Sequence, residues 1–126
     1  MRENNPEVEA FLPLSAPVFH VMLALADEPK HGYAILKEVE ARTHRKVQLS
    51  SGTLYAIMKR LLNDGVIEEI EDRRAQTDER RRSYRLTRLG RRVAEAEARR
   101  MEDLVRTAAE KRVFENFMRD GNVRDD

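Results

Sequence analysis

The sequence predicts a mainly α-helical chain with a small β-hairpin and a long helix at its C-terminal end. Apolar residues recur every three or four positions in four separate stretches, which is typical of amphipathic helices. Two short stretches, 66–70 and 83–87, are β-branched or alternating and are separated by a polar loop, which is typical of paired strands. With 126 residues, 40% of them hydrophobic, the chain can form one small core with an additional arm.

Composition and signals along the chain exclude several classes of protein. The absence of cysteine excludes disulfides and thiolate metal sites and fits a reducing cytoplasm. The start of the chain lacks the apolar run of a signal peptide, and the longest uncharged stretch, 10–26, is interrupted by prolines. His20, His31 and His44 lack metal-ligand spacing, and no glycine-rich phosphate loop is present. We therefore expect a cytoplasmic protein that is not an enzyme, needs no cofactor or metal, and contacts no membrane.

The first 13 residues contain two prolines and are predicted to form a flexible or loosely docked N-terminal arm. Ser15 is expected to cap the first helix, because a serine side chain accepts hydrogen bonds from free N–H groups there. Pro17 is tolerated in the first turn, and the helix is expected to end before Pro29. His20 lies among the apolar residues of this helix, where a tolerated or partner-facing histidine is expected rather than a ligand.

A second helix is expected over residues 31–42, and a basic connector, 43–48, follows it. Two interpretations of its start remain open. Gly32 can simply allow close packing, or exposed N–H groups and the hydroxyl of Tyr33 can contact a phosphate.

Residues 49–65 predict a helix with clear start and stop signals. Ser50 or Ser51 can cap it, and Gly65 supplies the left-handed residue that ends it. One face is apolar, and the opposite face has no acidic residue, being small or hydroxylated at first and cationic further on. The exposed face comprises Gly52, Thr53, Tyr55, Ala56, Lys59, Arg60 and Asn63. Such a face fits a groove of negative charge, so we hypothesise that residues 50–64 form a DNA-recognition helix.

Charge is segregated along the predicted hairpin. Residues 66–72 hold four acids and no base, whereas residues 73–85 hold six arginines against two acids, a local charge of +4. The loop between the strands, 71–82, has a cationic end at Arg80, Arg81 and Arg82. One interpretation of these arginines is a solvated charge run paired with the acids of residues 68–72.

The last helix is expected to be capped by Thr87 and to run from near Arg88 to at least Lys111. Its early apolar face is rotated from its later one, so one can pack on its own domain while the other meets a second copy. A single long solvated helix is the alternative. The predicted dimer interface consists of Phe19, Met101, Leu104, Val105 and Ala108.

Three helices, a hairpin with a basic loop and a long helix form the order of a winged helix-turn-helix domain followed by a dimerisation helix. Four motifs in this order resemble the PadR family of bacterial transcriptional regulators: His31-Gly-Tyr-Ala-Ile-Leu36, Leu49-Ser-Ser-Gly-Thr-Leu-Tyr55, Leu61-Leu-Asn-Asp-Gly-Val-Ile67 and Tyr84-Arg-Leu-Thr-Arg-Leu-Gly90. The resemblance covers roughly residues 14–113, and the short C-terminal segment is similar to the smaller subfamily with a single dimerisation helix.

The expected organisation is an N-terminal arm (1–13), a winged helix domain (14–87), a dimerisation helix region (88–120) and a frayed tail (121–126). The resemblance implies a homodimer that binds double-stranded operator DNA and generally represses transcription. A twofold dimer would favour an inverted-repeat operator.

Site residues follow from the resemblance by matched position. Ser51, Thr53, Tyr55 and Lys59 would lie at the major groove. Tyr33 would lie near a phosphate, and the tip formed by Arg80, Arg81 and Arg82 would reach the DNA backbone or the minor groove. The resemblance also implies a small aromatic effector, for which Phe19, Met22 and Met101 could line a pocket. A plain dimer core explains the same three residues.

The alternative function is a winged-helix module that binds a protein and not DNA. Such a module would need an apolar or acidic recognition face. The exposed face of the helix over residues 50–64 is neither.

Overall fold

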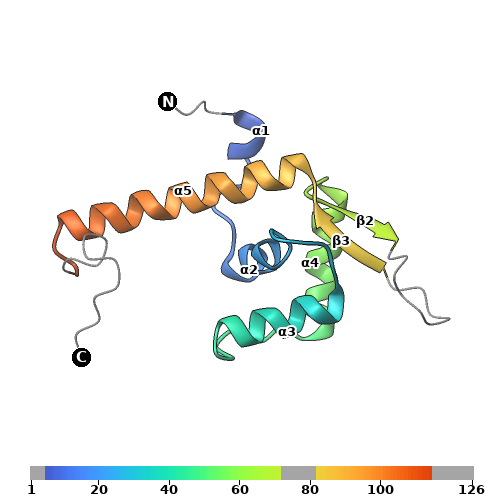
Figure 1. Cartoon of the computed structure of the whole chain (residues 1–126). Coiled ribbons are helices and arrows are strands. Elements are labelled where there is room, and N and C mark those ends of the chain that lie inside the picture. The colour runs from blue at the N-terminus through green and yellow to red at the C-terminus, as the bar shows by residue number, and fades with distance from the viewer. Residues whose placement is uncertain (1–4, 72–81, 115–126) are drawn as a thin grey trace.

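The computed structural model describes residues 5–71 and 82–114 of the chain. The described helices are α1 (Pro6–Glu9), α2 (Ala16–Ala24), α3 (Gly32–Arg42), α4 (Ser51–Asn63) and α5 (Arg88–Glu110), and the strands are β1 (Lys30–His31), β2 (Ile67–Glu71) and β3 (Arg82–Leu86) (Figure 1). This architecture confirms the predicted mainly helical winged helix fold with a long C-terminal helix. The predictions for Arg80, Arg81 and the tail over 121–126 lie outside the described residues.

Hydroxyl side chains cap the starts of α2, α4 and α5, as the sequence predicts. The Ser15 hydroxyl accepts from the Val18 amide at 3.3 Å, and the Thr87 hydroxyl accepts from the Gly90 amide at 3.0 Å. Of the two candidates at the start of α4, Ser50 is the cap, and its hydroxyl accepts from the amide of residue 53 at 3.0 Å. Gly65 has φ +76°, a left-handed conformation that favours glycine after a helix.

The sheet has three antiparallel strands in the order β1-β3-β2, one strand more than predicted. In the hairpin, Ile67 pairs with Leu86 and Glu69 with Tyr84. On the other side of β3, Lys30 of β1 pairs with Tyr84. A strand of two residues is too short to show an alternating pattern, which is why the sequence did not indicate β1. The third strand ties the start of α3 to the hairpin.

The core lies where α2, α3, α4 and the first half of α5 meet the inner face of the sheet. Its fully or almost fully buried side chains come from every one of these elements: Val21, Met22, Leu25, Ile35, Val39, Leu54, Met58, Leu61, Val66, Ile67, Leu86 and Val93. The apolar stripe of α4 therefore faces inward, which leaves its other face toward solvent.

The N-terminal segment is packed, which corrects the expectation of a flexible or loosely docked arm for its described residues. Asn5 caps α1 by accepting from the Glu7 amide at 2.9 Å, and Val8 is only 5% exposed. α1 packs against α5 and Figure 1 shows it lying across the first half of that helix. Phe11, Leu12 and Leu14 extend the same contact with the core. Burial of these apolar side chains favours the docked state over a free arm.

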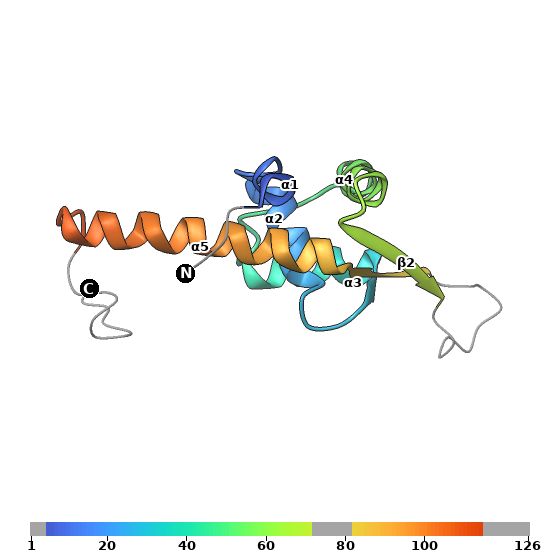
Figure 2. The same ribbon diagram turned by 90° about the horizontal axis from the view of Figure 1, so that it is seen from above.

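α5 extends beyond the rest of the described residues, as Figures 1 and 2 show. Its first half packs on the domain, with Gly90 and Val93 buried. Its second half exposes Met101, Leu104 and Val105, of which Leu104 is 58% exposed. None of the helices in the described ranges is long and apolar enough to cross a bilayer.

Candidate nucleic-acid interface

The face of α4 that the sequence predicts to be outward is exposed in the structure. Ser50, Ser51, Gly52, Thr53, Tyr55, Lys59 and Arg60 are all exposed, and Tyr55 is 74% exposed. Leu54, Met58 and Leu61 are buried on the opposite side. A Cβ added at Gly52 would meet nothing within 4 Å, so the first turn of α4 is open to a close approach from outside. The exposed residues of α4 were therefore predicted correctly from the sequence.

The start of α3 lies against this part of α4. A Cβ added at Gly32 would lie 3.7 Å from Leu54 Cδ2, in ordinary contact. This close packing is one of the two interpretations of Gly32, and it leaves the neighbouring Tyr33 65% exposed. We call the exposed residues of these two helices the α3–α4 surface; it consists of Tyr33, Lys37, Ser50, Ser51, Gly52, Thr53, Tyr55, Lys59 and Arg60.

Lys37 belongs to this surface, although it was not predicted from the sequence. Its Nζ lies 5.5 Å from the centroid of the Tyr33 ring, within the range of a cation–π contact. The four-residue spacing of the two side chains on α3 is the signal that could have revealed the pair.

The hairpin lies next to the start of α3 and packs against α4. The half-buried Tyr84 has a pKa above its ordinary value, first because burial disfavours the phenolate and then because of the nearby Glu69 carboxylate and Tyr55. Because Tyr84 pairs with Lys30 just before α3, and β2 packs against α4, the hairpin lies beside both helices of this surface.

Cations on the α3–α4 surface are free of acidic partners. Among the described residues, Lys37, Lys59 and Arg60 make no ion pair. Several basic side chains elsewhere are paired: Lys30 lies 2.7 Å from Asp27, and Arg99 lies 3.0 Å from Glu95. Three cations without acidic partners therefore give this surface a local positive charge, even though the net charge of the chain is only +1.

In the hairpin formed by β2 and β3, which is the wing of the domain, two arginines are paired with acids. Arg82 Nε lies 2.9 Å from a carboxylate oxygen of Glu69, and Arg85 Nε lies 2.7 Å from one of Glu68. For Arg82 the structure agrees with the interpretation of a charge run paired with the strand acids, and Arg85 forms a similar pair. The Arg82 side chain is still 73% exposed, so it remains accessible from outside.

A second polar cluster links α2 to α3 and has a structural role. Lys30 Nζ donates to the Ala24 carbonyl at 2.7 Å and lies 3.4 Å from a carboxylate oxygen of Glu38, which also pairs with Arg42. Arg42 in turn donates to the His20 carbonyl at 3.0 Å. Burial and the charge of Arg42 lower the pKa of His20. Within the described residues no group of acids and histidines could hold a metal ion.

The residues predicted to form a dimer interface are mixed in their exposure. Met101, Leu104 and Val105 are exposed and Ala108 is half-buried, whereas Phe19 is already buried in the single chain. The first four lie on one side of the projecting half of α5 at helical spacing. They are therefore available to a second copy, and Phe19 contributes mainly to the packing of its own chain.

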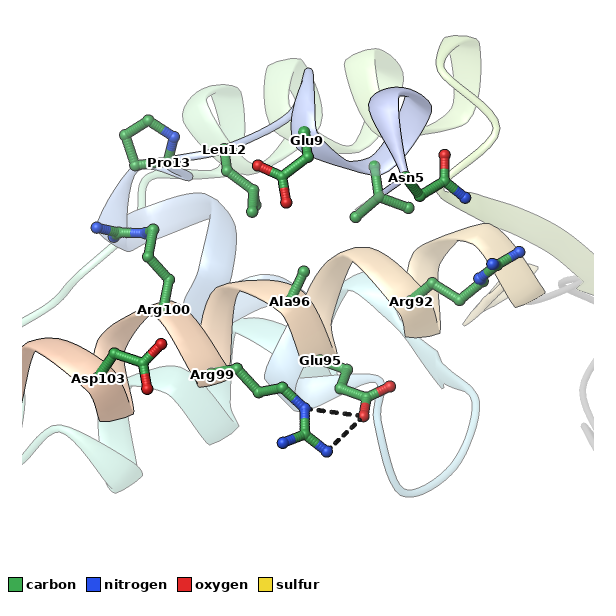
Figure 3. A pocket seen from close by; sticks show the side chains of 11 residues that line it. Asn5, Glu9, Leu12, Pro13, Arg92, Glu95, Ala96, Arg99, Arg100 and Asp103 are labelled. Carbon is green, nitrogen blue, oxygen red and sulfur yellow. Dashed lines mark hydrogen bonds and ion pairs between the residues drawn. The ribbon is translucent and has the colours of Figure 1, made fainter. Parts of the chain in front are cut away.

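The residues predicted to line an effector pocket do not line a hollow that lies between α1 and α5 in the described part of the chain. Met22 is fully buried in the core. A hollow of about 760 Å³ lies between α1 and α5, and none of Phe19, Met22 and Met101 lines it. Its lining includes Arg92, Arg99 and Arg100 with Glu9, Glu95 and Asp103, as Figure 3 shows. The effector stays a prediction.

Residues 21–96 match the transcriptional regulator PadR-like family. The chain belongs to this family. The resemblance carried by the four motifs is thereby confirmed, and because PadR-like proteins are transcriptional regulators, so is the expectation that the chain is not an enzyme.

Similar proteins agree with this assignment. A PadR-like transcription factor from Bacteroides fragilis has a TM-score of 0.63 and 24% identity, over 73% of this chain and 85% of that chain. Bacillus subtilis PadR in complex with operator DNA has a TM-score of 0.58 and 17% identity, over 65% of this chain and 46% of that chain. At these identities the likeness shows the winged helix fold alone.

A curated relative is an uncharacterised protein from Lysinibacillus sphaericus. It is 31% identical over 74 residues, which cover 56% of this chain. The chain spans 63% of the length of that relative.

Proposed function

We propose that this PadR-like protein is a DNA-binding transcriptional repressor that binds an inverted-repeat operator as a homodimer. The observation that carries the proposal is the exposed face of α4, which has no acid and holds Lys59 and Arg60 without ionic partners. The structural likeness to Bacillus subtilis PadR, which was solved in complex with operator DNA, supports the proposal.

Each part of the α3–α4 surface has a proposed role. Residues 51–59 of α4 enter the major groove, where Thr53 meets a thymine methyl group and Lys59 donates to guanine O6 and N7. The hydroxyls of Ser51 and Tyr55 contact base edges or phosphates. Tyr33 contacts a phosphate, which fixes the position of the domain without reading sequence.

The wing contributes contacts to the DNA backbone through Arg82, together with Arg80 and Arg81 outside the described residues. Because Arg82 pairs with Glu69, its contact competes with an ion pair inside the protein. We therefore assign sequence choice to α4 and a smaller share of the affinity to Arg82.

The apolar side of the projecting half of α5 forms the homodimer interface in this proposal. Burial of Leu104 and its neighbours in both copies would remove from water apolar surface that the single chain exposes. A twofold dimer places two recognition helices about one DNA turn apart, roughly 34 Å, and so fits an inverted repeat.

DNA binding is tested by fluorescence anisotropy of labelled duplexes selected by the purified protein from a random pool. Lys59→Ala is expected to reduce affinity and to relax base preference at one position of each half-site. Lys111→Ala is a matched control, because Lys111 is an exposed lysine at the far end of α5. Wild-type protein that enriches no sequence and shows no salt-dependent affinity would refute DNA binding and favour the protein-interaction module.

The homodimer is tested separately by sedimentation of wild-type protein and of Leu104→Glu. A charge on the apolar side of α5 is expected to give a monomer with weaker operator binding, since the two half-sites are then bound independently. Glu102→Gln, an exposed position on the same helix, should remain dimeric. A reporter gene placed behind the selected operator then distinguishes repression from activation.

A further inference from the structure

Lys37 and Tyr33 form an exposed pair on α3, outside the recognition helix and the wing. The Lys37 ammonium lies over the Tyr33 ring, 5.5 Å from its centroid. Long side chains on a helix lean toward its N-terminus, so Lys37 leans toward the end of α3 that packs on α4. Tyr33 is 65% exposed, and Lys37 is exposed as well. The pair therefore faces out beside the first turns of α4.

Lys37 makes no ion pair within the described part of the chain. Glu38, the next residue, is engaged by Lys30 and Arg42. Glu40 lies one turn further on and makes no ion pair with Lys37. A lysine without an ion pair inside the protein can bind an external anion without first breaking such a pair.

The ring contact also restricts where that charge can go. A free lysine side chain has to lose considerable rotamer freedom when it binds. The Tyr33 ring already holds the Lys37 ammonium on one side of α3. The ammonium is thus partly positioned before any ligand arrives.

We infer that Lys37, held by the ring of Tyr33, contacts a DNA phosphate beside the major groove that α4 enters. The inference rests on the proposed function and deepens it, because α3 then supplies a charged contact of its own and is more than a support for α4. Lys37 adds affinity and orientation and carries no base preference.

The test measures affinity against salt concentration for a labelled duplex that wild-type protein has selected. Each lysine–phosphate contact contributes about 0.9 to the slope of log affinity against log salt. Lys37→Ala is expected to make the slope less negative by about 0.9 per subunit and to weaken binding to specific and random duplexes by the same factor. Lys37→Arg, which keeps the charge, should restore most of the slope. Lys111→Ala should change neither quantity.

Two changes at Tyr33 separate the ring from the hydroxyl. Tyr33→Phe keeps the ring but loses the proposed contact between the hydroxyl and a phosphate, so it is expected to weaken binding without changing the salt slope. Tyr33→Leu removes the ring, and in this background Lys37→Ala is expected to cost less affinity than in the wild type, because the ammonium is no longer held. Thermal unfolding of each variant checks that the fold is intact.

The outcomes distinguish the inference from the proposed function. If the wild type binds no duplex, the proposed function fails and the inference fails with it. If the wild type binds with a steep salt dependence and Lys37→Ala behaves like Lys111→Ala, Lys37 makes no phosphate contact while the proposed function stands. A loss confined to the selected sequence would also overturn the inference, since it would mean that Lys37 reads a base.

Discussion

Gly90 and Val66 are in contact so close that no side chain fits between them. A Cβ added at Gly90 would lie 2.1 Å from the carbonyl oxygen of Val66 and 3.2 Å from Leu86 Cδ2. The same carbonyl accepts from the Thr87 amide at 3.0 Å, so the cap of α5 and the start of the hairpin are joined at one point. This contact sets the direction in which α5 leaves the winged helix domain.

Gly90→Ala is therefore expected to destabilise the protein. The methyl group would push the first turn of α5 away from a backbone carbonyl that cannot rotate aside, a cost of about 2 kcal/mol or more. The higher helix propensity of alanine, about 1 kcal/mol, does not offset this cost. Urea unfolding followed by circular dichroism measures the difference. A variant as stable as the wild type would mean that α5 and the hairpin separate readily at this point.

Gly52→Ala is expected to have the opposite effect on stability and to harm DNA binding. A Cβ at Gly52 meets nothing within 4 Å, so alanine gains helix propensity, about 0.5 to 1 kcal/mol, without a clash. If the first turn of α4 enters the major groove closely, the added methyl group keeps the backbone from the bases. Urea unfolding and fluorescence anisotropy on one sample should show higher stability with weaker binding. Unchanged affinity would place the DNA further from Gly52.

Helix starts and faces were predictable because their signals are local. A hydroxyl residue before an apolar stripe predicts a cap whatever the rest of the chain does, and Ser15 and Thr87 are caps. The exposed face of α4 was predicted in the same way, from the three- to four-residue spacing of its apolar residues. Features that depend on distant residues were not predictable. Val8 is buried because α1 meets α5, about ninety residues further along the chain, and β1 exists only because β3 pairs with it.

In the candidate site, too, the features with local signals were predictable and those that depend on distant residues were not. The outward residues of α4 were identified from the sequence, and Tyr33 was identified by resemblance. The pairing of Arg82 with Glu69 depends on strand register, which the sequence did not fix. Lys37 was missed because a lone lysine on a helix is usually a solvated charge, and its contact with Tyr33 becomes visible only in three dimensions.

Glu69→Gln is expected to strengthen the contribution of the wing to DNA binding. Glu69 holds Arg82 at 2.9 Å, and removing its charge frees that guanidinium and also removes a carboxylate that would repel phosphate. The salt slope should become steeper by up to about 0.9 per subunit if Arg82 then meets a phosphate. Glu95→Gln on α5 changes the net charge equally and serves as the control. Equal slopes in the two variants would remove Arg82 from the interface.

Glu97 is fully buried in the middle of α5, at a position where an apolar residue would be expected. Its two carboxylate oxygens accept from Arg100 Nε and Nη2, each at 2.8 Å. The hydrogen bonds from Arg100 hold the pKa of Glu97 below its ordinary value against the effect of burial.

The sign of the resulting pH dependence follows from the lowered pKa. A carboxylate with a lower pKa in the folded state stabilises the fold above its unfolded pKa, about 4.3 for glutamate, and this stabilisation is lost as pH falls through the folded pKa. Glu97→Gln is therefore expected to lose about 1 to 3 kcal/mol at pH 7, as for a hydrogen bond to a charged group. The difference from wild type should shrink below about pH 4.

Unfolding curves of both proteins between pH 3 and pH 7 measure this difference. Glu95→Gln is the matched control, because its exposed pair with Arg99 should be worth less than about 0.5 kcal/mol. If the loss in Glu97→Gln stays the same at every pH, the charge of Glu97 does not stabilise the fold, and shape alone explains its burial. If the loss shrinks as expected, the ion pair between Glu97 and Arg100 stabilises the junction from which the proposed dimerisation half of α5 projects.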